Sequence, residues 1–136
     1  MKAVLSGACN CGQVSFTIQA KSADIYQCHC SICRRASGVH GMGVLVIPKE
    51  QLTWLSGQDN ITTWRKPGHD WQTWFCQTCG STVPGHNDDA RYFVPAGLIT
   101  EGIDRLTVAH HIFVDSKAPW HVIGDEGKIH PEGFTG

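Results

Sequence analysis

The stretch CHCSICRR, residues 28 to 35, places three thiols within six residues and follows them with two arginines. Its thiols, Cys28, Cys30 and Cys33, are close enough in sequence for one loop to supply all three to a single ion. Residues 31–37 are the best helical candidate in the chain, and a single helical turn is expected there. The stretch therefore predicts a metal-binding loop beside a short helix.

The other cysteines fall into two further groups, so the chain has seven in all: Cys9 and Cys11, then Cys76 and Cys79. An odd number of thiols cannot pair completely into disulfides, and a reducing cytosol disfavours disulfides in any case. Gly80 after Cys79 permits the tight, positive-φ turn that lets two thiols face one ion. Each outlying pair is therefore predicted to be half of a tetrahedral zinc site.

Seven ligands divide naturally as four plus three. Four thiolates close a structural zinc shell, whereas three leave one position open for water or substrate. The residues leave two partitions open. The middle group can act alone while the outlying pairs join across the fold, or Cys9 and Cys11 can pair with two thiols of the middle group.

The cysteine pattern is also compatible with other uses of these thiols. They include a single structural zinc with spare buried cysteines, an iron–sulfur centre, and a redox pair at the C-x-x-C spacing. No βαβ pattern surrounds either copy of that spacing, which disfavours the redox pair. The preferred interpretation is three thiolates around a zinc with an open position.

The rest of the chain has the pattern of short strands, rich in β-branched and aromatic residues and bounded by Gly, Pro, Asn and Asp. The N-terminal segment is expected to be the first strand. Further strands are expected at residues 14–18, 44–47, 52–55, 61–64, 71–75, 91–94 and 106–114. No repeat or linker divides the sequence, so residues 1–136 are predicted to form a single zinc-binding domain of mainly β class.

Composition excludes some partners. A net charge of -1 gives no electrostatic reason to expect nucleic acid or an acidic membrane. The apolar run at residues 3–5 is far shorter than the roughly 7 to 15 residues of an export signal. No apolar stretch approaches the roughly 18 residues of a membrane span. The protein is expected to be soluble and cytoplasmic, and nothing specifies its oligomeric state.

The cysteine motifs, taken in order, resemble those of the glutathione-dependent formaldehyde-activating enzyme family, whose relatives include the centromere-protein-V-like proteins. The motifs are G-x-C-x-C-G near the N-terminus, C-H-C-S-x-C-R, and F-C-x-x-C-G-S. Residues 111–120, HIFVDSKAPW, are similar to the closing motif of that family. The resemblance spans roughly residues 7–120.

That resemblance implies a β-tent fold with two zinc ions per chain, one structural and one catalytic. It implies that Cys9, Cys11, Cys76 and Cys79 hold the structural zinc. It also implies that Cys28, Cys30 and Cys33 hold the catalytic one. The implied activity is condensation of glutathione with formaldehyde to S-hydroxymethylglutathione, classed from its reverse direction as a carbon–sulfur lyase.

Several other residues are candidates for roles around the second zinc. Arg34 or Arg35 could bind a carboxylate of a glutathione-like substrate through bidentate contacts. His29 is expected to face away from the metal and to pack, not to act as a ligand. No histidine is named as the general base. The five tryptophans are expected in the core, although Trp120 could line a pocket.

Two functional hypotheses follow. The first is a zinc-dependent enzyme that handles adducts of glutathione, or another thiol, with small aldehydes such as formaldehyde. The second is a non-catalytic zinc-binding module that serves as a structural or interaction platform. They differ in whether the three-thiol site can be lost without unfolding the domain.

Overall fold

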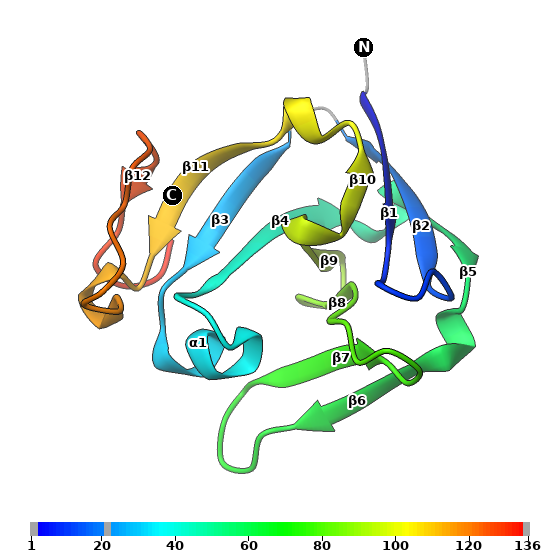
Figure 1. Cartoon of the computed structure of the whole chain (residues 1–136), viewed down its shortest axis with the longest axis horizontal. Helices are drawn as coiled ribbons and strands as arrows, with labels where there is room; N and C mark the ends of the chain where they lie inside the picture. The colour runs from blue at the N-terminus through cyan, green and yellow to red at the C-terminus, as the bar shows by residue number, and fades with distance from the viewer. Residues whose placement is uncertain (1–2, 21–22, 135–136) are drawn as a thin grey trace.

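The computed structural model describes residues 3–20 and 23–134 and is mainly β, as predicted (Figure 1). Residues 1–2, 21–22 and 135–136 of the expected domain lie outside the described residues. One antiparallel sheet has the strand order β10-β1-β2-β5. Its strands are β1 (Ala3–Ala8), β2 (Ser15–Ala20), β5 (Leu52–Ser56) and β10 (Ile99–Glu101).

The second sheet has the order β12-β11-β3-β4-β9-β8. Its strand β11 runs parallel to both β3 and β12, and the remaining pairs are antiparallel. The strands are β3 (Asp24–Cys28), β4 (Met42–Pro48), β8 (Gly85–His86), β9 (Arg91–Pro95), β11 (Thr107–Ile112) and β12 (Lys128–Ile129). Strand β3 ends on Cys28, the first thiol of the middle group.

A separate hairpin consists of β6 (Ile61–Arg65) and β7 (Gln72–Cys76), which pair only with each other as a two-stranded sheet. Its register opposes Ile61 to Cys76 at one end and Arg65 to Gln72 at the other. Figure 1 shows this hairpin in green, projecting below the two larger sheets. It therefore carries the last cysteine pair at its base and a polar loop at its far end.

The helix expected at residues 31–37 is present as α1 (Ser31–Ser37). It ends at Gly38, which adopts the left-handed conformation at φ 76° and donates its N–H to the Arg34 carbonyl oxygen at 2.8 Å. Short 3-10 turns connect the strands elsewhere: η1 (Lys49–Gln51), η2 (Gln58–Asn60), η3 (Ala96–Leu98), η4 (Ile103–Arg105) and η5 (Val114–Ser116).

The main core is formed by side chains of the two larger sheets. Alternation in β2 buries Phe16 and Ile18 completely, while Thr17 and Gln19 between and beside them are more exposed. Leu45 on β4 and Val94 on β9 belong to the same cluster. A smaller cluster forms around Cys9, Val14, Cys76 and Val83, with Trp54 and Trp74 packed against it. Cys9 and Cys76 are thus part of a hydrophobic core, and Cys79 packs against it, whereas Cys11 is exposed.

The sequence interpretation is confirmed for the first strand, for the helix and for all seven listed runs of strand-forming residues, within one or two residues at most ends. It did not include β3, β8, β10 or β12. The expectation of core tryptophans is wrong for two of the five. Trp64 is 51% exposed and Trp120 is 67% exposed, because both lie on segments with solvent on one side. No helix within the described part of the chain is long and apolar enough to cross a membrane.

Candidate metal centres

Two similar turns present the outlying cysteine pairs. In the first, Gly12 adopts φ 82° and donates its N–H to the Cys9 carbonyl oxygen at 3.0 Å. In the second, Gly80 adopts φ 78° and donates to the Cys76 carbonyl oxygen at 2.8 Å. The positive φ that favours glycine allows each chain to reverse directly after its second thiol. Both turns therefore aim their sulfurs at a common point, as Gly80 predicted for the second turn.

The structure gathers Cys9, Cys11, Cys76 and Cys79 so that their Sγ atoms all lie within 4.8 Å of one another. Sγ of Cys11 lies 3.6 Å from that of Cys9 and 3.7 Å from that of Cys76. Tetrahedral zinc with Zn–S bonds of about 2.3 Å separates its sulfurs by about 3.8 Å. The four-thiol site therefore fits a tetrahedral metal ion, and the outlying pairs join each other and not the middle group.

Neighbouring donors support the four-thiol site. The Val14 N–H donates to Cys9 Sγ at 3.3 Å, and the Asn60 amide donates to Cys76 Sγ at 3.5 Å. Ser81 links the two turns, because its Oγ accepts the Asn10 N–H at 3.0 Å and lies 3.2 Å from Cys79 Sγ. The contact with Ser81 lowers the pKa of the Cys79 thiol to about 5. The pKa of Cys76 is lowered as well, first by the Cys79 N–H, whereas the pKa of Cys11 is raised to about 12, so Cys76 and Cys79 are the thiols that lose their protons most readily.

The middle group forms a second site at the junction of β3 and α1. Cys28 ends β3, Cys30 caps α1 and Cys33 lies in its first turn. The three Sγ atoms lie within 4.8 Å of one another, with 3.1 Å between Cys28 and Cys33. A Cβ at Gly41 would come within 2.2 Å of the Cys28 carbonyl oxygen, so only glycine allows β4 to begin this close to the loop.

The Cys30 thiol loses its proton most readily of the three. Hydrogen bonds from the Cys28 and Cys33 thiols, with N–H groups at the start of α1, lower the pKa of Cys30 to about 2. The Cys30 sulfur accepts the Cys33 N–H at 3.3 Å as a helix cap. In return, the hydrogen bond with Cys30 raises the pKa of Cys28 to about 11. A cation at this site would release the remaining protons, and three thiols around one anion suit such a cation.

The three-thiol site opens into a cleft of about 1070 Å³, which Cys28 and Cys33 line. The residues lining this cleft include none of the four thiols of the other site. The apolar residues that line the cleft are Met42, Val44, Trp71, Trp74 and Phe93. Trp74 lies against the backbone of Gly85, where a Cβ would come within 2.1 Å of the indole ring. The three-thiol site therefore faces a cavity, whereas the four-thiol site lies away from it, with Cys9 and Cys76 buried and Cys11 exposed.

Charged side chains line the rest of the cleft: Lys49, Arg65, Asp70, Asp88 and Asp89. Lys49 also places its ammonium 5.3 Å from the centre of the Tyr92 ring, and the Arg65 guanidinium donates to Gln72 Oε1 at 3.0 Å. Both signs of charge are thus present around one cavity that starts at a cluster of thiols. This combination suits a small zwitterion that carries both carboxylate and ammonium groups.

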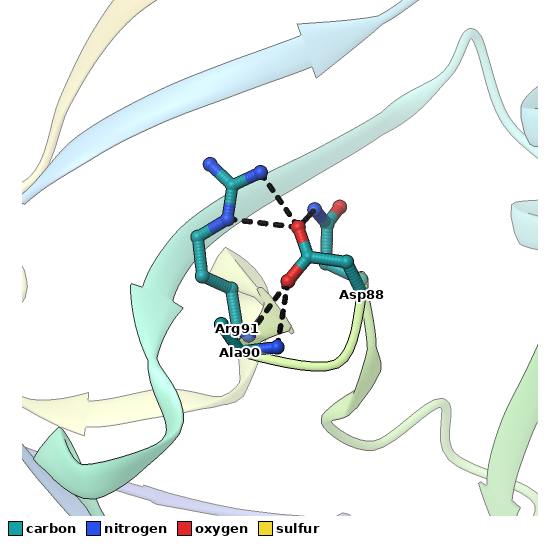
Figure 2. A network of polar contacts seen from close by, with 4 residues as sticks. Asp88, Ala90 and Arg91 are labelled. Carbon is teal, nitrogen blue, oxygen red and sulfur yellow. Dashed lines mark hydrogen bonds and ion pairs between the residues drawn. The ribbon is translucent and has the colours of Figure 1, made fainter.

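A tight loop fixes one rim of the cleft between β8 and β9 (Figure 2). The Asp88 carboxylate accepts the backbone N–H groups of Ala90 and Arg91 at 2.9 and 2.8 Å. It also accepts two bonds from the Arg91 guanidinium, at 2.9 and 2.6 Å. These contacts lower the pKa of Asp88 to about 2. The carboxylate of Asp88 is thus committed to its own loop, which leaves Asp70 and Asp89 as the acidic groups for a ligand.

The predicted substrate residues Arg34 and Arg35 lie on α1 and are not among the residues that line the cleft. Arg34 is half-buried, and its Nε has no hydrogen-bond partner among the described residues. Sequence reasoning missed Lys49 and Arg65. In the sequence, Arg65 stands out only because it lies beside a turn between two aromatic strands. That position does not show which part of the fold the turn faces.

His29 is fully buried and belongs to neither thiol group, as expected. Burial lowers its pKa to about 4, and the nearby His111 adds to the effect. It is therefore a neutral imidazole. Its Nε2 lies 2.8 Å from Nδ1 of His111, which is the first residue of the closing motif.

Comparison with known proteins agrees with this geometry. A crystal structure of a Rhodobacter sphaeroides protein is similar, with a TM-score of 0.57 and 27% sequence identity over 71% of this chain and 88% of that chain. The family model described as glutathione-dependent formaldehyde-activating enzyme matches residues 4–116, which include both thiol groups. Because this match covers most of the sequence, the chain belongs to the glutathione-dependent formaldehyde-activating enzyme family.

Proposed function

We propose that this protein is a zinc-dependent enzyme that joins a thiol such as glutathione to a small aldehyde such as formaldehyde, or cleaves such an adduct. In the cleavage direction it is a carbon–sulfur lyase. We also propose that residues 1–136 form one β-tent domain with two zinc ions. The cytoplasmic location stays a prediction from the sequence.

The observation that carries this proposal is the difference between the two thiol groups. Cys28 and Cys33 line a cleft of about 1070 Å³, whereas the four-thiol site has no residue in its lining. A site with four ligands away from the cleft suits a structural ion, and a site with three ligands beside a cavity suits a catalytic one. Family membership supports the same thiol and aldehyde chemistry.

In this proposal Cys28, Cys30 and Cys33 hold the catalytic zinc, and Cys9, Cys11, Cys76 and Cys79 hold the structural zinc. The catalytic zinc, when bound, supplies a position where an incoming thiol is held as its thiolate. In the forward reaction the thiol loses its proton, its sulfur forms a bond to the carbonyl carbon, and the carbonyl oxygen takes up a proton. The reverse reaction breaks the same C–S bond and returns the proton to sulfur.

The cleft residues bind and orient the substrate. Glutathione carries two carboxylates and one ammonium group, and Lys49 and Arg65 can pair with the carboxylates. Asp70 and Asp89 are available to the ammonium. Trp71 and Trp74 exclude water from the reacting sulfur. His86 also lines the cleft, and burial lowers its pKa, so a neutral imidazole is available there to take up the thiol proton.

Exchange NMR tests the proposed reaction. Glutathione and formaldehyde are held near equilibrium with the adduct, and the exchange rate is followed with and without protein. We expect zinc-loaded protein to accelerate exchange well above the spontaneous rate. Exchange at the spontaneous rate, with two zinc ions bound per chain, would rule out this substrate pair.

Substitution of Arg65 tests where the substrate carboxylate binds. We expect Arg65→Ala to raise the KM for glutathione about tenfold, because one charge-assisted pair is worth about 1.5 kcal/mol or more. The value of kcat should change little, since in this proposal Arg65 binds a carboxylate and not the reacting atoms. Arg35→Ala is the matched control, because it removes the same charge from the surface of α1. A larger effect at Arg35 would favour the carboxylate site predicted from the sequence over the cleft.

A further inference from the structure

Three side chains far apart in the sequence form one line of hydrogen bonds behind the three-thiol site. His29 lies between two of its thiols, and its Nε2 is 2.8 Å from Nδ1 of His111 on β11. Nε2 of His111 is 2.7 Å from Oδ1 of Asp125, which precedes β12. The line thus runs from the metal-binding loop to an exposed carboxylate.

The carboxylate sets the proton positions along this line when both imidazoles are neutral. A carboxylate can only accept, so Nε2 of His111 carries a proton and donates it to Asp125. Nδ1 of His111 then has a lone pair and accepts from Nε2–H of His29. His29 must therefore keep Nδ1 unprotonated. Each ring has one allowed tautomer, and each tautomer is set from the Asp125 end.

Burial makes this order costly to change. His29 is 0% exposed and His111 is 2% exposed. Nδ1 of His29 is buried without a hydrogen-bond partner among the described residues. A buried lone pair without a partner is better tolerated than a buried N–H without one. Reversing the line would place a proton on that nitrogen, so the environment of His29 favours the same order that the carboxylate imposes.

The outer end of the line is itself held in place. Asp125 Oδ1 accepts the Gly127 N–H at 2.8 Å as well as the bond from His111. A Cβ at Gly127 would come within 2.9 Å of His111 Cδ2, so the chain passes directly against the imidazole. At the inner end, the backbone N–H of His29 donates to the Ile112 carbonyl oxygen at 3.0 Å. Both the ring and the backbone of His29 are thus attached to β11 or to the segment that follows it.

We propose that Asp125 and His111 are positioning residues that fix the ring of His29 and thereby the spacing of the Cys28 and Cys30 sulfurs. Because His29 is the single residue between these two thiols, a change in its φ or ψ changes the direction of one thiol relative to the other, and a ring that is held in place restricts such a change. The inference rests on the proposed zinc site at Cys28, Cys30 and Cys33. If it holds, Asp125 and His111 raise the metal affinity of the three-thiol site, although both lie far from its cysteines in the sequence.

Metal affinity of variants tests the proposal. The four-thiol site is first filled with zinc, and Co²⁺ binding to the three-thiol site is then followed by its thiolate-to-metal absorption. We expect Asp125→Ala to weaken Co²⁺ binding there about tenfold, the low end of the effect of residues that orient metal ligands. Asp125→Asn should restore most of the affinity, because its amide oxygen can still accept from His111.

Glu126→Ala is the matched control, since it removes a neighbouring exposed carboxylate that makes no side-chain hydrogen bond among the described residues. It should bind Co²⁺ as wild type does, which separates positioning from long-range charge. Equal Co²⁺ affinity of Asp125→Ala and wild type would overturn the proposal. So would an equal loss in Glu126→Ala.

A second measurement does not depend on metal. Two-bond ¹⁵N–¹H NMR spectra of the histidine rings report which nitrogen carries the proton. We expect protonated Nε2 and unprotonated Nδ1 on both His29 and His111 in the wild-type protein, and loss of this single state for His111 in Asp125→Ala. A proton on Nδ1 of His29 in wild type would overturn the inference. Failure of wild type to bind any metal at the three-thiol site would instead contradict the proposed function.

Discussion

Replacing Cys76 by serine is expected to unfold most of the protein at room temperature. Cys76 is 0% exposed, lies at the base of the β6–β7 hairpin and joins residues near the N-terminus through the four-thiol site. A structural zinc contributes on the order of 10 kcal/mol to folding. A domain of this size has a net stability of about 5 to 15 kcal/mol. Loss of most of the metal contribution therefore removes most of the free energy of unfolding.

Circular dichroism during heating, together with zinc analysis, measures this effect. Thr78→Ser is a suitable control, because it changes an exposed residue of the same turn and keeps the hydroxyl that accepts from Asn60. We expect the control to melt as wild type does. A folded Cys76→Ser protein with unchanged melting temperature would show that the four-thiol site is not structural.

Replacing Cys30 by serine is expected to leave the protein folded but inactive. Serine is among the best residues for capping a helix, so the cap on the Cys33 N–H survives the change. The three-thiol site, however, loses the sulfur whose pKa lies lowest, and with it the first ligand available to a metal. We expect loss of one zinc per chain and at least about a 100-fold loss of exchange activity, more than ligand-orienting residues cause.

The same NMR exchange assay and a zinc count per folded chain measure this outcome. Ala36→Ser on the exposed face of α1 serves as the control and should keep both zinc ions and full activity. Collapse of the fold in Cys30→Ser would favour the alternative hypothesis of a non-catalytic module with two structural ions. Full activity in a variant that has lost one zinc would remove the three-thiol site from the mechanism.

Sequence reasoning predicted the parts of this protein that depend on local pattern. Alternation identified β2, cysteine spacing identified the two outlying half-sites, and Gly80 after Cys79 identified a tight turn at the second. These features depend on residues near each other in the chain. Physical reasoning left the division of the seven thiols open, because it depends on which distant turns meet. The fold decides this by bringing Cys11 within 3.7 Å of Cys76, across 65 residues.

The walls of the cleft could not be predicted for the same reason. Lys49 follows β4, Arg65 ends β6 and Asp89 precedes β9, so three separate elements converge on one cavity. No spacing in the sequence relates them. Arg34 and Arg35 were predicted to bind substrate because they follow Cys33 directly, yet the short helix carries them out of the lining of the cleft. Their role in substrate binding stays a prediction.

Among the described residues, the hairpin of β6 and β7 is attached to the rest of the fold at one end only. At its fixed end, Cys76 and Trp74 share main-chain hydrogen bonds with Ser81 and Val83, at 2.8 and 3.0 Å. At its free end, the main-chain bonds of residues 65–72 stay within the hairpin itself. A two-stranded ribbon of this kind is compliant. We therefore expect the free end of the hairpin, which carries Arg65 and Asp70, to move more readily than the thiol sites.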